Sequence, residues 1–155
     1  MLEQIRQLIQ EQNTCVLATA SENVPYTSFM AYAPAQDAQT VYLATFRSTK
    51  KYANISRNPS VSLLIDNRSD NLTPNREQTL ALTITGTAAS MPENAARENA
   101  RNELLRRHPH LEEFLAHPDV DILAVDVEAV LLLTGVRESH YERIAPEKNE
   151  ESIKI

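Results

Sequence analysis

The alternation of apolar and polar residues predicts an initial helix and then short strands. The helix is indicated by apolar residues at helical spacing in a polar stretch, at Leu2, Ile5, Leu8 and Ile9. Three segments rich in β-branched and small residues follow, with turn residues between them, and predict strands at residues 14–20, 26–32 and 40–45. Short strands with short connections are typical of an antiparallel meander.

Helices interrupt the strands in the rest of the chain. Residues 48–57 have helical character, with Ser48 or Thr49 as the N-cap and Asn58-Pro59 as the stop. Pro92 is expected to open a helix that ends near Arg107. A short second helix at 109–117, strands at 60–66, 78–89, 120–127 and 129–136, and a polar loop at 67–76 complete the prediction.

These elements indicate a mainly β protein with helices, an α+β fold. Six or seven strands in a flat open sheet would leave exposed edges, so we expect them to close into a small β-barrel with peripheral helices. The length of 155 residues suits one core. We assign residues 1–141 to a single domain and residues 142–155 to a charged C-terminal tail.

Composition and charge exclude several classes of protein. The net charge of −6 argues against nucleic acid as the main partner. No apolar run approaches the roughly 18 residues needed to span a bilayer, and the N-terminus lacks the pattern of a signal peptide. Cys15 is the only cysteine, so no internal disulfide and no thiolate zinc site is expected. A cytoplasmic protein without a membrane partner is predicted.

Glycine is scarce, and this excludes the glycine-rich phosphate loops. The two glycines, Gly86 and Gly135, are too far apart to form a phosphate loop or a dinucleotide fingerprint. Gly86 lies in a predicted long strand, where it indicates a bend or bulge of a closing barrel.

Positive charge is concentrated around one predicted helix. Residues 39–65 contain no acid but carry four bases, Arg47, Lys50, Lys51 and Arg57, so the remaining residues together carry −10. Three of these bases surround the start of the helix, where free backbone N–H groups favour an anion. The hydroxyls of Ser48 and Thr49 add donors. Either a phosphate site or a solvated basic helix face is consistent with this pattern.

An ordered set of segments resembles the FMN-binding split-barrel family typified by pyridoxamine 5′-phosphate oxidase. The segments are Val41-Tyr42-Leu43-Ala44-Thr45, Thr49-Lys50-Lys51 and Asn58-Pro59-Ser60-Val61-Ser62-Leu63-Leu64, with Pro25-Tyr26-Thr27-Ser28 upstream and Thr85-Gly86-Thr87-Ala88 downstream. The resemblance implies an antiparallel split β-barrel of six to seven strands. It also implies a homodimer with FMN at the subunit interface.

The resemblance implies an FMN site residue by residue. Thr49, Lys50 and Lys51 would hold the 5′-phosphate, and Thr45 would lie near the phosphate or the ribityl chain. The isoalloxazine ring would be lined, largely through backbone groups, by Ser28, Phe29, Met30 and Ala31.

Three departures from the family pattern affect the expected activity. Ser28 stands where the oxidase has an Arg, and Ala44 replaces an aromatic residue. The oxidase binds its substrate through Arg-x-His-x-Arg, whereas Arg137, His140 and Arg143 are three residues apart here. On a strand this spacing places successive side chains on opposite faces. True pyridoxamine 5′-phosphate oxidase activity is therefore not expected, and no catalytic residue is assigned.

Other candidate groups have simpler interpretations. His108, His110 and His117 lack the spacing of a metal site and are interpreted as surface residues, so no metal is expected. His140, after Gly135, is reminiscent of haem-utilisation members of the same superfamily, which makes haem an alternative cofactor. Cys15 has apolar neighbours and is interpreted as a buried, inert thiol.

Three functions remain open at this stage. The first is an FMN-dependent oxidoreductase that acts on a small-molecule substrate by hydride transfer at the flavin. The second is a module that binds FMN or haem for storage, sensing or delivery without turnover. The third is a structural dimer of the same fold without a cofactor.

Overall fold

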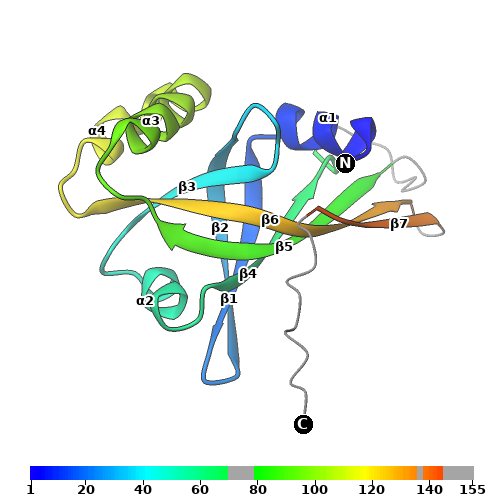
Figure 1. Cartoon of the computed structure of the whole chain (residues 1–155), viewed down its shortest axis with the longest axis horizontal. Coiled ribbons are helices and arrows are strands. Elements are labelled where there is room, and N and C mark those ends of the chain that lie inside the picture. The colour runs from blue at the N-terminus through cyan, green and yellow to red at the C-terminus, as the bar shows by residue number, and fades with distance from the viewer. Residues whose placement is uncertain (70–78, 136–137, 145–155) are drawn as a thin grey trace, which may run out of the picture.

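Seven antiparallel strands build the protein, whose computed structural model describes residues 1–69, 79–135 and 138–144 (Figure 1). The strands are β1 (Thr14–Ser21), β2 (Val24–Pro34), β3 (Thr40–Phe46), β4 (Ser60–Asp66), β5 (Leu80–Ser90), β6 (Val120–Thr134) and β7 (Glu138–Arg143). Their order in the sheet is β3-β2-β1-β4-β5-β6-β7, and an additional pairing of β3 with β6 closes the first six into a barrel. β7 extends the sheet beyond β6. The predicted α+β split-barrel fold is confirmed.

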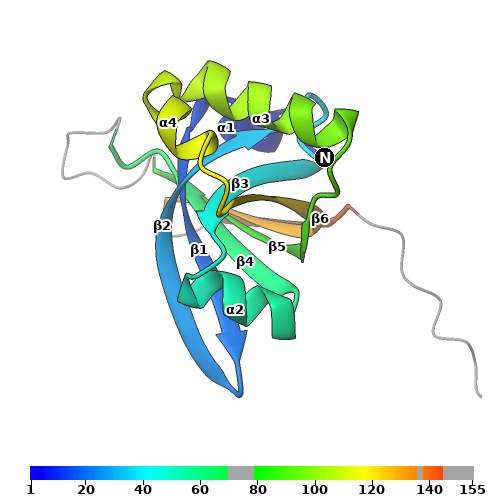
Figure 2. The same cartoon turned by 90° about the vertical axis from the view of Figure 1, so that its left-hand side faces the viewer.

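The helices cover the barrel on different sides. They are α1 (Glu3–Glu11), α2 (Lys50–Arg57), α3 (Ala95–Arg107), the 3₁₀ turn η2 (Pro109–Leu111) and α4 (Glu112–Leu115). α1 and α2 lie at opposite ends of the barrel, whereas α3 and α4 lie outside it, over β2 and β3 (Figures 1 and 2). No helix among the described residues is long and apolar enough to cross a membrane.

Two apolar clusters follow from this arrangement. The larger fills the barrel with the inward-facing residues of β1–β6 and with Ile5, Leu8 and Ile9 of α1. The smaller lies on the outer face, where Ala100 and Leu104 of α3 pack against Ala33 and Ile122 of the strands. Residues 40–46 therefore contribute to both clusters through alternate side chains, which fixes the register of β3.

One expected strand boundary is wrong. The strands predicted at 120–127 and 129–136 are a single strand, β6, which pairs with all of β5 through its residues 123–134. Thr85 pairs with Ala129 and Gly86 with Val127, so Glu128 is an extra residue, a β-bulge. A Cβ on Gly86 would lie 2.2 Å from the backbone oxygen of Asp126, and only glycine fits this close approach. The bulge expected at Gly86 is confirmed.

The start of α3 also differs from the prediction. The helix begins at Ala95 rather than at Pro92, because the side chain of Asn94 accepts hydrogen bonds from the backbone N–H groups of Ala96 and Arg97. The predicted loop at 67–76 and the predicted tail lie mostly outside the described residues. Of the tail residues that the structure does describe, Glu142 and Arg143 belong to β7.

Candidate functional site

A cavity of about 240 Å³ lies outside the barrel, where β2 and β3 meet the helices. Its walls come from three parts of the chain, β2, the segment from β3 to α2, and the segment from α3 to α4. The lining residues are Phe29, Met30, Ala31, Ala44, Thr45, Phe46, Thr49, Lys51, Leu104, Leu111 and Phe114. In Figure 2, α2 lies below β3 and the α3–α4 segment above it, so the cavity lies between two helical layers.

The β2 wall is formed by residues predicted from the resemblance. Phe29 is 76% exposed, an unusual state for a large aromatic side chain that borders a cavity. Met30 is buried in the barrel core and also borders the cavity, as does the half-buried Ala31. This wall therefore offers apolar surface and strand backbone to a ligand.

The β3–α2 wall is a hydrogen-bonded turn. Thr49 is the N-cap of α2, and its Oγ1 accepts from the backbone N–H of Tyr52 at 3.4 Å. The same hydroxyl donates to the backbone oxygen of Phe46 at 2.9 Å and lies 3.0 Å from Oγ1 of Thr45. These contacts hold the end of β3 against the first turn of α2, where free backbone N–H groups face outward.

Two lysines follow the cap. Lys51 borders the cavity and is half-buried, and desolvation by burial lowers the pKa of its ammonium group from the ordinary value of 10.5. Lys50 is exposed and does not line the cavity. Within the described part of the chain, neither lysine forms an ion pair. The end of the cavity at α2 is thus positively charged and lacks a counter-ion from the described residues.

The structure brings together most of the site residues expected from the sequence. Six of them line the one cavity: Phe29, Met30, Ala31, Thr45, Thr49 and Lys51. Ser28 does not line it. It is opposite the buried Leu17 in the β1–β2 pairing, and opposed residues share a face of the sheet. Ser28 therefore faces the interior side of β2.

The third wall was not expected to belong to a site. Leu104, Leu111 and Phe114 belong to segments that were predicted only as peripheral helices on the outside of the barrel. They do pack there, and they also close the cavity opposite α2. The Phe114 ring meets the Phe46 ring edge to face, with 5.1 Å between the ring centroids. Apolar helical spacing alone carried no signal that these side chains border a cavity.

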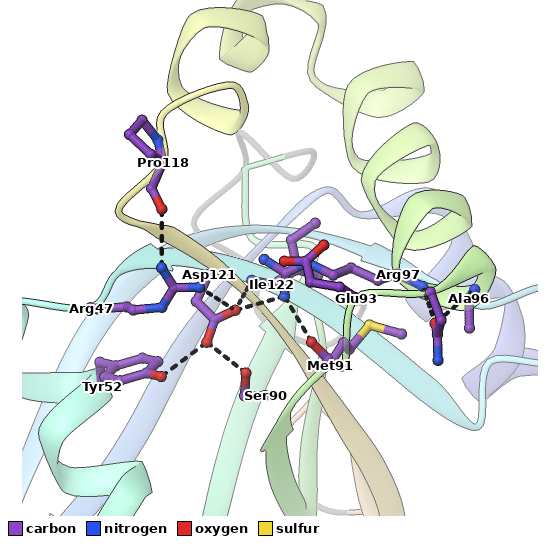
Figure 3. Close-up of polar contacts among 11 residues, drawn as sticks. Arg47, Tyr52, Ser90, Met91, Glu93, Ala96, Arg97, Pro118, Asp121 and Ile122 are labelled. Atoms are coloured by element: carbon purple, nitrogen blue, oxygen red, sulfur yellow. Dashed lines mark hydrogen bonds and ion pairs between the residues drawn. The ribbon is translucent and has the colours of Figure 1, made fainter.

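Arg47 forms an ion pair with a buried acid and does not line the cavity. Its guanidinium lies 3.6 Å from Asp121 and donates to the backbone oxygen of Pro118 at 3.0 Å (Figure 3). Asp121 is only 1% exposed, and Arg97 of α3 also donates to it, at 2.7 Å. The cationic cluster expected around the start of α2 is therefore reduced to Lys50 and Lys51.

Hydrogen bonds keep Asp121 ionised. Burial tends to raise the pKa of this carboxyl, but hydrogen bonds from Ser90, Arg97 and Tyr52, together with the charge of Arg97, lower it below its ordinary value of 3.8. Ser90 donates to Oδ2 at 2.6 Å and Tyr52 at 3.0 Å. Asp121 thus joins α2, α3 and the end of β5 (Figure 3), and it pairs with Thr45 of the cavity wall in the β3–β6 register.

The remaining candidates do not line the cavity. His108 is buried, with Nε2 2.9 Å from the backbone oxygen of Tyr32, so its interpretation as a surface residue is wrong; His110 and His117 are exposed. The described residues contain no group of three His, Cys, Asp or Glu that could hold a metal ion. Cys15 is buried, which raises the pKa of its thiol to about 12 and makes it a poor nucleophile.

Two of the three residues compared with the family's substrate-binding motif, His140 and Arg143, lie on β7. His140 is 3.5 Å from Glu142, and Arg143 ends the strand. Arg137 lies outside the described residues.

A family model described as pyridoxamine 5′-phosphate oxidase matches residues 1–134. No curated protein is significantly similar in sequence. Among solved structures, a haem-binding protein from Mycobacterium smegmatis is similar with a TM-score of 0.81 and 21% identity, over 91% of this chain and 57% of that one. The chain therefore spans little more than half the length of that protein.

Two further solved structures are similar over nearly their whole length. HutZ, a haem storage protein from Vibrio cholerae, matches with a TM-score of 0.71 and 17% identity, over 85% of this chain and 92% of that one. An FAD-binding protein from Mesorhizobium loti matches with a TM-score of 0.68 and 15% identity, over 85% and 94%. At these identities the likeness concerns the fold, which is one that flavin-binding and haem-binding proteins share.

Proposed function

The chain belongs to the pyridoxamine 5′-phosphate oxidase family, and on that premise we propose that it binds FMN in the cavity between β2, α2 and α3. The bound flavin would serve an oxidoreductase reaction on a small molecule. One observation carries the proposal. The cavity is positively charged at one end, where α2 starts, and its other walls are largely apolar. FMN has the same two parts, a phosphate and a largely apolar ring system.

The phosphate end fits the first turn of α2. The backbone N–H groups of this turn, the Thr49 hydroxyl and the Lys50 and Lys51 ammonium groups are donors of the kind that hold phosphates. Burial disfavours the charge on Lys51, and a phosphate beside it would compensate that cost. The glycine-rich loop that the chain lacks is replaced in this arrangement by side chains.

The ring end fits the apolar walls but needs a further surface. A volume of about 240 Å³ is smaller than the roughly 300–1,000 Å³ typical of ligand pockets. Phe29 leaves a large apolar face open beside the cavity. We propose that a second copy of the chain covers this side, so that the functional unit is a homodimer with FMN at the interface.

The chain supplies binding and water exclusion in this proposal. When bound, FMN accepts or donates a hydride. The described cavity is lined by no Asp, Glu, His or Cys, so Lys51 is its one titratable side chain. A general acid or base, if the reaction needs one, would come from the substrate or from the partner copy.

The spectrum of the freshly purified protein is the direct test. Flavin absorption bands, or uptake of added FMN by the colourless protein with quenching of FMN fluorescence, would support the proposal. Bleaching by NADH or NADPH and recovery in air would then separate an enzyme from a binder. A colourless protein that takes up neither FMN nor haem would overturn cofactor binding and favour the structural dimer.

A haem-binding or flavin-binding module without turnover is the second candidate. The similar structures from M. smegmatis and V. cholerae are described as haem-binding and haem storage proteins, and this supports haem binding as the alternative function. Titration with haemin distinguishes it. A strong Soret band that saturates at one haem per site, without FMN uptake, would overturn the first proposal and support haem binding.

A further inference from the structure

We propose that the hydrogen bond from Tyr52 to Asp121 positions the first turn of α2, and thereby the groups that hold the anion. The proposal concerns a residue outside the cavity. For what the turn binds, it rests on the proposed function. Tyr52 is thus a positioning residue that acts through its neighbours Thr49 and Lys51.

Asp121 is a fixed point to which α2 can be anchored. It lies at the start of β6, directly opposite Thr45 of β3 in the pairing that closes the barrel. Its Oδ1 accepts from Arg97 at 2.7 Å and from its own neighbour, the backbone N–H of Ile122, at 3.0 Å. A buried carboxylate held by this many donors has little freedom to move.

Tyr52 transmits that position to the cavity. Its side chain is half-buried against the barrel core, and its hydroxyl reaches Oδ2 of Asp121 at 3.0 Å. Consecutive residues of a helix differ by about 100° around the axis. Holding Tyr52 against the barrel therefore sets the direction in which Lys51 leaves the helix, which is toward the cavity. The backbone N–H of Tyr52 also donates to the cap, Thr49.

Ser90 offers a matched control within the same cluster. It donates to the same oxygen of Asp121, at 2.6 Å, but it belongs to the end of β5 and has no part in α2. Tyr52→Phe and Ser90→Ala each remove one hydroxyl that donates to Oδ2 of Asp121, and both leave the net charge unchanged. A general loss of stability would affect both variants alike, whereas a positioning role affects only Tyr52→Phe.

FMN titration of the full chain separates the two. We expect Tyr52→Phe to weaken FMN binding about fivefold, as the loss of one hydrogen bond implies, and Ser90→Ala to change it less than about twofold. In a Lys51→Ala background the effect of Tyr52→Phe should shrink, because the residue acts through that lysine. Equal affinities of Tyr52→Phe and wild type would overturn the proposal, and so would equal losses in both variants.

Hydrogen exchange tests the same proposal without a ligand. The backbone amides of residues 52–54 should exchange faster in Tyr52→Phe than in wild type, and at the wild-type rate in Ser90→Ala. If the wild-type protein takes up no FMN, the proposed function fails while this measurement still decides the anchoring of α2. Unchanged exchange rates in Tyr52→Phe would show that the hydrogen bond does not position the turn.

Discussion

The hydroxyl of Thr45, at the end of β3, lies 3.0 Å from the hydroxyl of Thr49, at the start of α2. This contact bridges the turn that forms one wall of the cavity. Because Thr49 also caps the helix and donates to Phe46, a single hydroxyl joins the strand, the turn and the helix. Thr49 also lines the cavity, so the side chain that caps the helix is placed to contact a ligand.

Removal of the Thr49 hydroxyl should cost both stability and affinity. Thr49→Ala loses the N-cap, which is worth about 1 kcal/mol. Urea denaturation should show a loss of that size, and FMN binding should weaken as well. Thr49→Ser retains the hydroxyl and serves as the control, with both properties near those of wild type. A Thr49→Ala variant as stable as wild type would show that the helix does not depend on this cap.

The two lysines should dominate the affinity for FMN. Lys51→Ala removes a charge-assisted contact of roughly 1.5–3 kcal/mol, or about tenfold or more in affinity. Lys50→Ala should weaken binding by a smaller factor, because Lys50 is exposed and outside the cavity. Arg57→Ala, in the last turn of the same helix, changes the net charge equally and should leave affinity within about twofold. Unchanged affinity in both lysine variants would place the phosphate elsewhere.

Asp121 should make the protein sensitive to acid. Its folded-state pKa is lower than 3.8, so the carboxylate contributes stability above about pH 4, and this contribution is lost as the pH falls through the folded-state pKa. Asp121→Asn removes the buried carboxylate that pairs with Arg97 and Arg47, and should cost about 3 kcal/mol at pH 7. The difference in free energy of unfolding between Asp121→Asn and wild type should narrow below pH 4. Urea midpoints at pH 7 and pH 3 measure it, and a constant difference would contradict the prediction.

Gly86→Ala should destabilise the barrel where β5 passes the bulge of β6. The added Cβ would lie 2.2 Å from the backbone oxygen of Asp126, so one strand must shift. We expect a loss of at least about 2 kcal/mol in the free energy of unfolding. Thr87→Ala, on the neighbouring residue, removes an exposed hydrogen bond to Glu128 and should cost less than about 1 kcal/mol. Equal losses would mean that the close approach relaxes freely.

Local patterns were sufficient to predict most elements of the fold. Periodicity and caps placed α1 and α2, and Gly86 indicated the bulge. The predicted break in β6 was wrong because Glu128, a charged residue between apolar runs, is accommodated as a bulge instead of ending the strand. Pairing partners decide whether such a residue interrupts a strand, and they lie about forty residues away in the sequence.

The site was predictable only where it follows the chain. Thr49 and Lys51 are neighbours of a cap, and the resemblance placed β2 beside them, so six expected residues do line one cavity. Phe114 comes from a distant helix and carries no chemical signal. The role of Arg47 depends on Asp121, 74 residues later, and no local pattern reveals that this cation is already neutralised. Tertiary electrostatics, unlike helix capping, has no short-range signature.

The pairing of β3 with β6 has a consequence for the order of events during synthesis. Thr40 and Asp126 meet across this seam although they are 86 residues apart. Contacts of such long range form late, since the intervening chain must be ordered first. The β3 wall of the cavity, the α3–α4 wall and the anchor at Asp121 come together only at this seam. Under the proposed function, a ribosome-bound chain that has not yet released β6 would therefore lack the completed cavity, and FMN would load only onto the completed barrel.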